Sequence, residues 1–68
     1  MIEFELKTEY IELCNLLKIA NLVATGGHAK IVIAEGEVLL DGEVETRKRK
    51  KVSKGSVVEY EGSTIKVI

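Results

Sequence analysis

The sequence predicts a single α+β domain over residues 1–68, with an N-terminal strand, two packed helices and a small antiparallel sheet of hairpins. Three patterns support this fold class. Apolar and polar residues alternate in residues 2–7, as in a half-buried strand. Apolar residues then recur at helical spacing in two stretches. After Gly36, short β-type runs alternate with glycine-containing turns.

The first strand and the first helix follow from the N-terminal pattern. The apolar face of the strand consists of Ile2, Phe4 and Leu6. Thr8 offers a hydroxyl that can cap a helix over residues 9–19, where early glutamates suit the positive end of the helix dipole. Asn21 can end this helix in a left-handed conformation. The apolar stripe of the helix is formed by Tyr10, Leu13, Cys14 and Leu17.

A second helix is expected over residues 26–35. The β-branched run at residues 31–33 is equally compatible with a strand. A helix is favoured because Thr25 can cap its start and Gly36 can end it. Its buried stripe would consist of Ala29, Val32 and Ile33.

Two hairpins complete the expected fold. Residues 38–40 and 43–45 flank Asp41-Gly42, a pair that favours a type I′ turn. Residues 56–60 and 64–68 form the second pair of strands, joined by residues 61–63. The core side of this pair consists of Val58, Tyr60, Ile65 and Val67. Between the hairpins, Val52 is expected to anchor the chain and Lys54-Gly55 to turn it.

Size and composition favour a binding module over an enzyme. A chain of 68 residues forms a small core and has little volume for an enclosed pocket. Cys14 is the one cysteine and His28 the one histidine, so an internal disulfide and a four-ligand zinc site are both excluded. We therefore expect no metal, no cofactor and no small-molecule substrate.

The chain has neither the apolar stretch of about 18 residues that a transmembrane helix needs nor a recognisable secretory signal. The single cysteine fits a reducing compartment. A cytoplasmic location without a membrane partner is expected.

The net charge of −1 conceals a strong local asymmetry. Six of the ten basic residues lie in residues 46–54, which contain no acid and are called the basic segment below. Its cations are Arg47, Lys48, Arg49, Lys50, Lys51 and Lys54. So dense a run creates a positive field that attracts polyanions. If all six met phosphates of a single strand, affinity would fall roughly 10²- to 10³-fold between about 50 and 200 mM salt. The alternative is a run that pairs with nearby acids and increases solubility.

The start of the second helix is a further candidate site. Gly27 lets a nucleic-acid backbone approach without a Cβ in the way, free N–H groups attract phosphate, and Lys30 adds a charge. A simple Gly-Gly turn is the alternative. For His28 the pattern favours a solvated position, with contact to a phosphate or a base as the alternative.

The positions of Cys14 and of the aromatic residues limit the kinds of functional site that this chain can form. A thiol in the apolar stripe of a helix behaves as a small hydrophobe, and the only histidine belongs to another element. The aromatic residues Phe4, Tyr10 and Tyr60 all fall at expected core positions. Stacking on unpaired bases is therefore not expected, and recognition of shape and phosphates in folded or double-stranded RNA is favoured.

Several motifs together resemble a known family. They are Leu16-Leu17-Lys18, Gly27-His28-Ala29-Lys30, Glu35-Gly36, Val38-Leu39-Leu40-Asp41-Gly42 and Val52-Ser53-Lys54-Gly55. The set is similar to the RNA-binding domain named after small-subunit ribosomal protein S-four, also called the alpha-L RNA-binding motif. Residues 31–36 and 42–49 resemble its short, free-standing bacterial form, the YbcJ-like ribosome-associated proteins.

The resemblance implies that structured RNA binds to one positive face formed by the two helices and a turn between strands. It assigns RNA contacts to Gly27 and Lys30 and to the basic residues Arg47, Lys48, Arg49 and Lys51. The wider family often has Ser-Arg where Thr25-Gly26 stands, and Gly-Asp where Gly55-Ser56 stands. The first departure removes a cation and moves binding toward residues 47–51.

We therefore expect a non-enzymatic, monomeric protein that binds structured RNA, with ribosomal RNA as a candidate. The expected contacts are Gly27, His28, Lys30, Arg47, Lys48, Arg49, Lys50, Lys51 and Lys54. One alternative is a protein interaction module that uses an acidic face or an exposed sheet edge. Another is a small thiol-dependent enzyme that uses Cys14.

Overall fold

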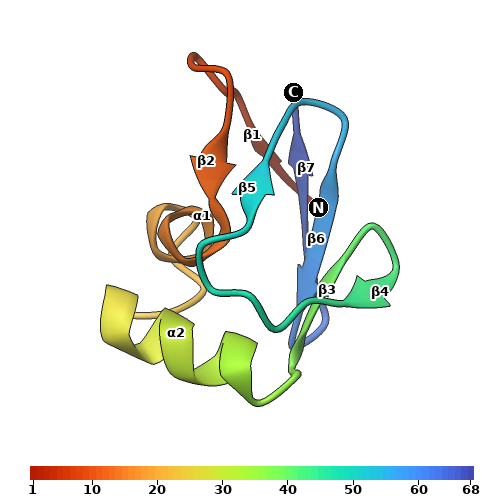
Figure 1. Cartoon of the computed structure of the whole chain (residues 1–68). Helices are drawn as coiled ribbons and strands as arrows, with labels where there is room; N and C mark the ends of the chain where they lie inside the picture. Colours follow the sequence, from red (N-terminus) through yellow and green to blue (C-terminus); the bar gives the residue numbers. More distant parts are fainter.

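The computed structural model describes residues 1–68, which form two helices and seven strands (Figure 1). The helices are α1 (Leu13–Ile19) and α2 (Gly26–Ala34). The strands are β1 (Ile2–Phe4), β2 (Ile11–Glu12), β3 (Val38–Leu40), β4 (Glu43–Val44), β5 (Lys51–Val52), β6 (Val57–Tyr60) and β7 (Ser63–Val67). This arrangement confirms the α+β fold class. Neither helix is long and apolar enough to cross a membrane.

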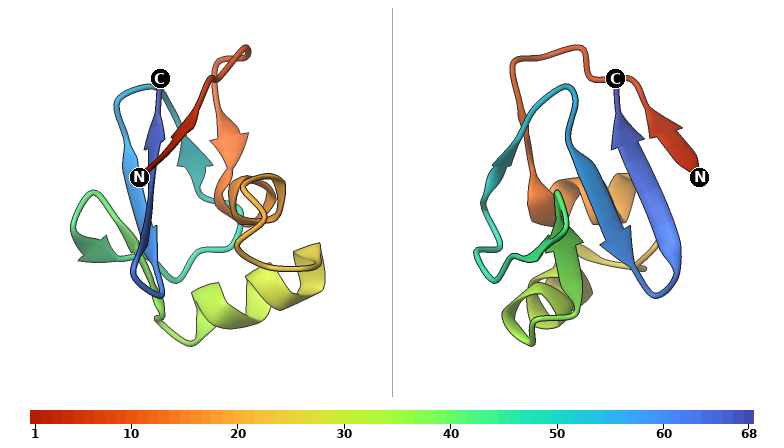
Figure 2. Two further views of the ribbon diagram at one scale, coloured as in Figure 1. Left: turned by 180° about the vertical axis from the view of Figure 1, so that it is seen from behind. Right: turned by 90° about the vertical axis from the view of Figure 1, so that its right-hand side faces the viewer.

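The strands form two sheets. Five strands make a mixed sheet in the order β1-β7-β6-β3-β4, in which β1 runs parallel to β7 and the other neighbours are antiparallel. Strands β2 and β5 form a separate antiparallel ribbon. Both helices and this ribbon lie on one side of the large sheet (Figure 2). The alternating N-terminal pattern predicted a strand over residues 2–7, whereas β1 ends at Phe4, and the pattern could not specify its parallel partner.

The core is apolar and contains no buried polar or charged side chain. The predicted core residues of the last hairpin, Val58, Tyr60, Ile65 and Val67, are all buried. They lie on one face because the period of a strand is two and the register pairs Val58 with Ile65. The helices cover this face with their stripes, which include Leu13, Leu16, Leu17, Ala29, Val32 and Ile33.

Most local signals in the sequence act as predicted. Thr25 Oγ1 accepts a hydrogen bond from the His28 N–H at 3.0 Å and caps α2. Asn21 has φ 64° just after α1. Asp41 and Gly42 have φ of 52° and 86°, which fits the type I′ turn between β3 and β4. Ser63 already belongs to β7, so the second hairpin turns at residues 61–62 rather than over 61–63.

The predicted start of the first helix is wrong. The helix begins at Leu13 rather than at residue 9, because residues 11–12 form β2 and pair with β5. Thr8 does not cap it, and its hydroxyl instead donates to the Tyr10 carbonyl at 2.8 Å. Tyr10 therefore precedes the helix and is 42% exposed rather than buried in the core.

Substitutions on the buried and exposed faces of α1 should differ in their effect on stability. Leu17→Ala removes a fully buried side chain and should lower the free energy of unfolding by about 2–5 kcal/mol. The neighbouring change Lys18→Ala affects an exposed side chain and should alter it by less than about 0.5 kcal/mol. Urea unfolding followed by circular dichroism measures both, and equal effects would contradict the position of this helix.

Candidate nucleic-acid interface

The basic segment connects β4 to β6 and runs beside the start of α1 (Figure 1). Residues 47–50 form a turn closed by a hydrogen bond from the Lys50 N–H to the Arg47 carbonyl at 3.1 Å. The chain then enters β5, where Val52 is 1% exposed and serves as the predicted anchor. The segment is therefore held to the body of the domain by an ordered backbone.

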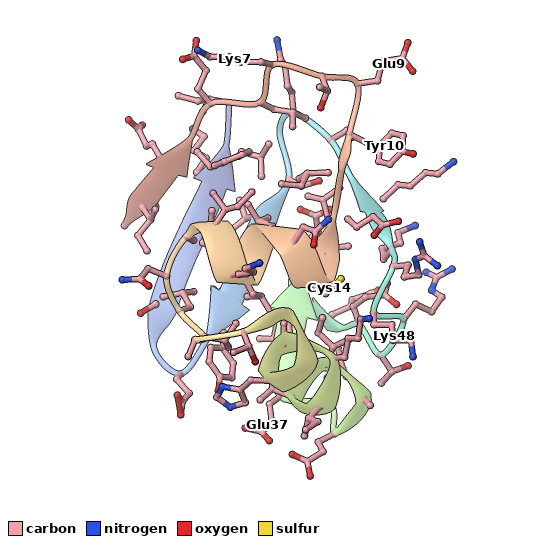
Figure 3. All side chains as sticks on the ribbon, turned by 90° about the vertical axis from the view of Figure 1, so that its left-hand side faces the viewer. Lys7, Glu9, Tyr10, Cys14, Glu37 and Lys48 are labelled. Carbon is pink, nitrogen blue, oxygen red and sulfur yellow. The ribbon has the colours of Figure 1, made fainter.

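Backbone hydrogen bonds join this segment to the first turn of α1. The Leu13 N–H donates to the Lys50 carbonyl at 2.9 Å, and the Cys14 N–H donates to the Lys48 carbonyl at 3.1 Å. The residue before the helix, Glu12, makes no side-chain cap. Carbonyls of the basic segment thus satisfy N–H groups that a helix start leaves free. The Lys48 side chain points outward at the edge of the molecule (Figure 3).

The cations gather around one surface depression. This depression has a volume of about 380 Å³, and its lining consists only of Arg47, Arg49, Lys50 and Lys51. Lys48 belongs to the same turn and is exposed. Lys54 follows β5 in a turn next to the end of β7, because the N–H of the following residue, Gly55, donates to the Val67 carbonyl at 2.8 Å. The structure therefore brings together residues 47–51 and leaves Lys54 at their margin.

Two carboxylates neutralise part of this charge. The Arg47 Nε and Nη2 atoms donate to the two carboxylate oxygens of Glu45 at 2.9 and 3.1 Å. The Arg49 Nε donates to a Glu12 carboxylate oxygen at 3.3 Å. No ion pair engages Lys48, Lys50, Lys51 or Lys54. The run at residues 47–51 thus retains an excess of positive charge that is available to a ligand.

The pairing with Arg47 changes the titration of Glu45. Its pKa falls from 4.5 to about 2, chiefly because the Arg47 guanidinium donates to the carboxylate and secondly because the Arg47 backbone N–H also does. The same contact raises the pKa of Arg47. Glu45 therefore stays ionised and holds one end of the turn, although it reduces the local positive charge.

The candidate residues at the start of α2 do not share one face. His28 and Lys30 are two positions apart, which puts them about 200° apart around a helix. His28 lies near Glu37, whose pKa is raised chiefly by a hydrogen bond with Glu35, and His28 exerts a smaller opposing effect. A Cβ on Gly27 would meet only Thr25 Oγ1, at 3.8 Å, so this fold does not require glycine there. His28 and Lys30 therefore cannot contact one ligand from the same face of α2.

One group of acidic residues lies on a different part of the surface. A depression of about 330 Å³ is lined partly by Glu37, Glu59 and Glu61, together with Tyr60. Burial raises the pKa of the Tyr60 phenol, and Glu61 raises it further. In Figure 3 Glu37 lies beneath α2, whereas Lys48 and Tyr10 lie along another edge. Acids also adjoin the basic segment, because Asp41, Glu43 and Glu45 line another depression together with Arg47 and Lys50. The unpaired positive charge is therefore a local feature of residues 47–51.

The cysteine, the histidine and the acidic side chains do not form a further site. The Cys14 thiol is free and buried in α1, while His28 is exposed on α2. No group of three or more His, Cys, Asp or Glu side chains is arranged to hold a metal ion. Neither observation adds a second candidate site to the basic surface.

Tyr10 is the residue that the sequence reasoning missed. Its ring lies next to the basic segment, with the Lys51 Nζ atom 4.9 Å from the ring centroid. The helical spacing of Tyr10 with Leu13 and Cys14 suggested a core position. The strand at residues 11–12 turns Tyr10 outward instead, and only the pairing of β2 with β5 shows this.

Comparisons with known proteins agree with this fold. The model of the S4 domain family matches residues 4–68. Escherichia coli (strain K12) YbcJ, named as a candidate RNA-binding protein, is 47% identical over 62 residues that cover 91% of this chain and 89% of YbcJ. Bacillus subtilis (strain 168) RlbA, named as a candidate ribosome maturation protein, is 44% identical over 55 residues, or 81% and 78% of the two chains. The solution structure of Escherichia coli YbcJ is described as revealing an alpha-L motif involved in RNA binding. It matches this chain with a TM-score of 0.77 and 46% sequence identity, and the match covers 100% of this chain and 87% of that one.

The depressed pKa of Glu45 predicts a pH-dependent contribution to stability. Because the folded pKa of about 2 lies below the unfolded value of 4.5, the contribution is complete above pH 4.5 and disappears as the pH falls toward 2. The difference in urea midpoint between the parent protein and Glu45→Gln should therefore be largest above pH 5 and vanish near pH 2. Glu43→Gln, which removes a carboxylate without an ion pair, is the control. A difference that stays constant with pH would contradict the pairing.

Proposed function

Because this chain belongs to the S4 domain family, we propose that it binds structured RNA, with ribosomal RNA as the class of target. The observation that carries this proposal is the depression lined only by Arg47, Arg49, Lys50 and Lys51. Such a surface fits phosphate oxygens, which accept hydrogen bonds from guanidinium and ammonium groups. The similarity to RlbA, which is named for ribosome maturation, supports ribosomal RNA as the target class.

The backbone of the basic segment is already ordered for this role. The turn at residues 47–50 and the strand β5 are fixed by hydrogen bonds that do not involve the cationic side chains. RNA therefore needs to order only side chains, which reduces the entropic cost of binding. Phosphates can also approach the two paired arginines, because the side chains of Arg47 and Arg49 are 70% and 74% exposed.

Helix α2 contributes less to the proposed surface. It lies beside the loop that carries the basic segment (Figures 1 and 2), and Lys30 is the one cation it adds. His28 lies about 200° around the helix from Lys30, so the two side chains do not share one face. Contacts from Gly27, His28, Lys30 and Lys54 stay predictions, and we place the centre of binding at residues 47–51.

The proposed role is binding without a catalytic step, by one chain for each RNA site, within the cytoplasm. The small apolar core and the open, basic character of the surface support this role. An interaction module for proteins is the alternative, and it would retain its partner after complete digestion of RNA.

Charge reversal at the turn tests the proposal. The combined change Arg47→Glu, Lys48→Glu and Arg49→Glu removes three cations, so affinity for a fluorescently labelled ribosomal RNA fragment should fall at least about 100-fold near 100 mM salt. The parent protein should lose roughly 10²- to 10³-fold between about 50 and 200 mM salt, with one chain bound per site. Fluorescence anisotropy measures both quantities.

The matched control is Lys7→Glu, Lys18→Glu and Lys66→Glu, which gives the same net charge with changes at exposed positions elsewhere. Its affinity should stay within a few-fold of that of the parent, and circular dichroism should show both variants folded. Binding that is insensitive to salt, or equal loss in the two variants, would refute binding through the basic segment.

Removal of a competing carboxylate should strengthen binding. Glu12→Gln frees Arg49 from its ion pair at 3.3 Å, and it leaves helix α1 intact because Glu12 provides no side-chain cap. RNA affinity should rise about two- to fivefold, in line with the strength of an exposed ion pair. Glu3→Gln, an exposed change on β1 without an ion pair, is the control for net charge. The same titration measures both variants, and an unchanged or weaker affinity for Glu12→Gln would argue against Arg49 as a contact.

A further inference from the structure

An exposed aromatic ring stands at the margin of the basic surface. Tyr10 is 42% exposed, whereas Tyr60 is buried and Phe4 is partly buried against the core. Core formation therefore does not account for the ring of Tyr10. In Figure 3 Tyr10 and Lys48 lie along the same edge of the molecule, and Tyr10 points away from the helices.

Tyr10 adjoins two different surroundings. The Lys51 Nζ atom lies over the ring at 4.9 Å from the centroid, and Lys51 also lines the basic depression. Tyr10 itself lines a second depression of about 380 Å³ with Thr8, Glu9, Ile11, Glu12 and Asn15. This second depression contains no cation and two glutamates, so it repels phosphates.

A nucleobase matches this second depression. A base is uncharged and offers a flat π face to a tyrosine ring. Its N–H groups can donate hydrogen bonds to a carboxylate such as that of Glu9. Glu12 already accepts a hydrogen bond from Arg49, which leaves Glu9 as the free acceptor. The phosphate of the same nucleotide would meet Lys51 at the shared margin of the two depressions.

We propose that Tyr10 is a stacking platform for one unpaired base of the RNA, and that it makes this chain prefer RNA helices interrupted by an unpaired nucleotide. This inference rests on the proposed function and adds base recognition to phosphate recognition. A perfect duplex keeps its bases stacked inside, so Tyr10 cannot reach them. An unpaired base can leave the helix and stack on the ring beside Lys51.

Two RNA probes test the inference. One is a duplex of about 16 base pairs, and the other is the same duplex with a single unpaired 2-aminopurine. The parent protein should bind the interrupted duplex about tenfold more tightly, within the range known for stacking of one base on an aromatic side chain. Binding should also quench the 2-aminopurine fluorescence, because that signal reports stacking of the base directly.

Variants at Tyr10 separate stacking from charge. Tyr10→Leu should lose the tenfold preference and the quenching, while its affinity for the perfect duplex and its salt dependence stay unchanged. Tyr10→Phe keeps the ring and should retain both. The control Ile19→Ala removes another exposed apolar side chain, 59% exposed at the end of α1, and should leave the preference intact. Circular dichroism checks that every variant is folded.

The outcomes distinguish this inference from the proposed function. If the parent protein binds both RNAs equally in a salt-dependent way and without quenching, the proposed function stands and Tyr10 is no stacking platform. If it binds neither RNA at any salt concentration, the proposed function fails and the inference fails with it. The quenching is measured on the parent protein alone, so a Tyr10→Leu variant that does not fold leaves the test decisive.

Discussion

The two hydrogen bonds from the Leu13 and Cys14 N–H groups to the Lys50 and Lys48 carbonyls are the constraint on which the functional surface depends. They cap α1 without a capping side chain, and together with the pairing of β2 and β5 they determine where the helix begins. They also draw the carbonyls of the basic segment inward, which leaves its cationic side chains outside. One set of backbone contacts thus completes the helix and presents the charge.

Backbone anchoring explains how five consecutive cations are tolerated. A hydrogen bond contributes about 0.5–1.5 kcal/mol to stability, and an exposed ion pair contributes at most about 1 kcal/mol. The conformation of the basic segment is therefore stabilised mainly by its backbone hydrogen bonds to α1 and β2, and less by its ion pairs. Repulsion among the cations is screened over about 10 Å at ordinary salt and is further reduced by Glu12 and Glu45. The segment therefore keeps its shape while much of its charge remains unpaired, and that unpaired charge makes it suitable for binding a polyanion.

Whether an element could be predicted depended on how far apart its determinants lie in sequence. Thr25 and Asp41-Gly42 act within a few residues, and their cap and turn were predicted correctly. The alternation in β6 and β7 likewise placed their core residues. By contrast, the carbonyls that accept from the first turn of α1 lie 37 and 34 residues downstream of Leu13 and Cys14, so a local cap at Thr8 was the only one that sequence patterns could suggest. The same error hid Tyr10. The distribution of charge along the sequence located the basic segment, but the pairing of Arg49 with Glu12, 37 residues away, depends on tertiary geometry.

The small surface of the domain limits how many bases it can contact, and therefore how it can select among RNAs. Its total accessible surface is 4232 Å², and a single nucleic-acid-binding module usually buries about 600–1,000 Å², so an interface of this kind would occupy roughly one seventh to one quarter of the surface. Such an area holds few base contacts beside the five cations, and contacts to phosphates do not distinguish one sequence from another. Helix α2 adds little, because Gly26 stands where the wider family often has a cation and Lys30 is the one lysine or arginine on the helix. Selectivity among structured RNAs must therefore come from RNA shape and from the few groups at the margin of the basic surface that phosphates do not occupy. Tyr10 is the exposed aromatic residue at that margin.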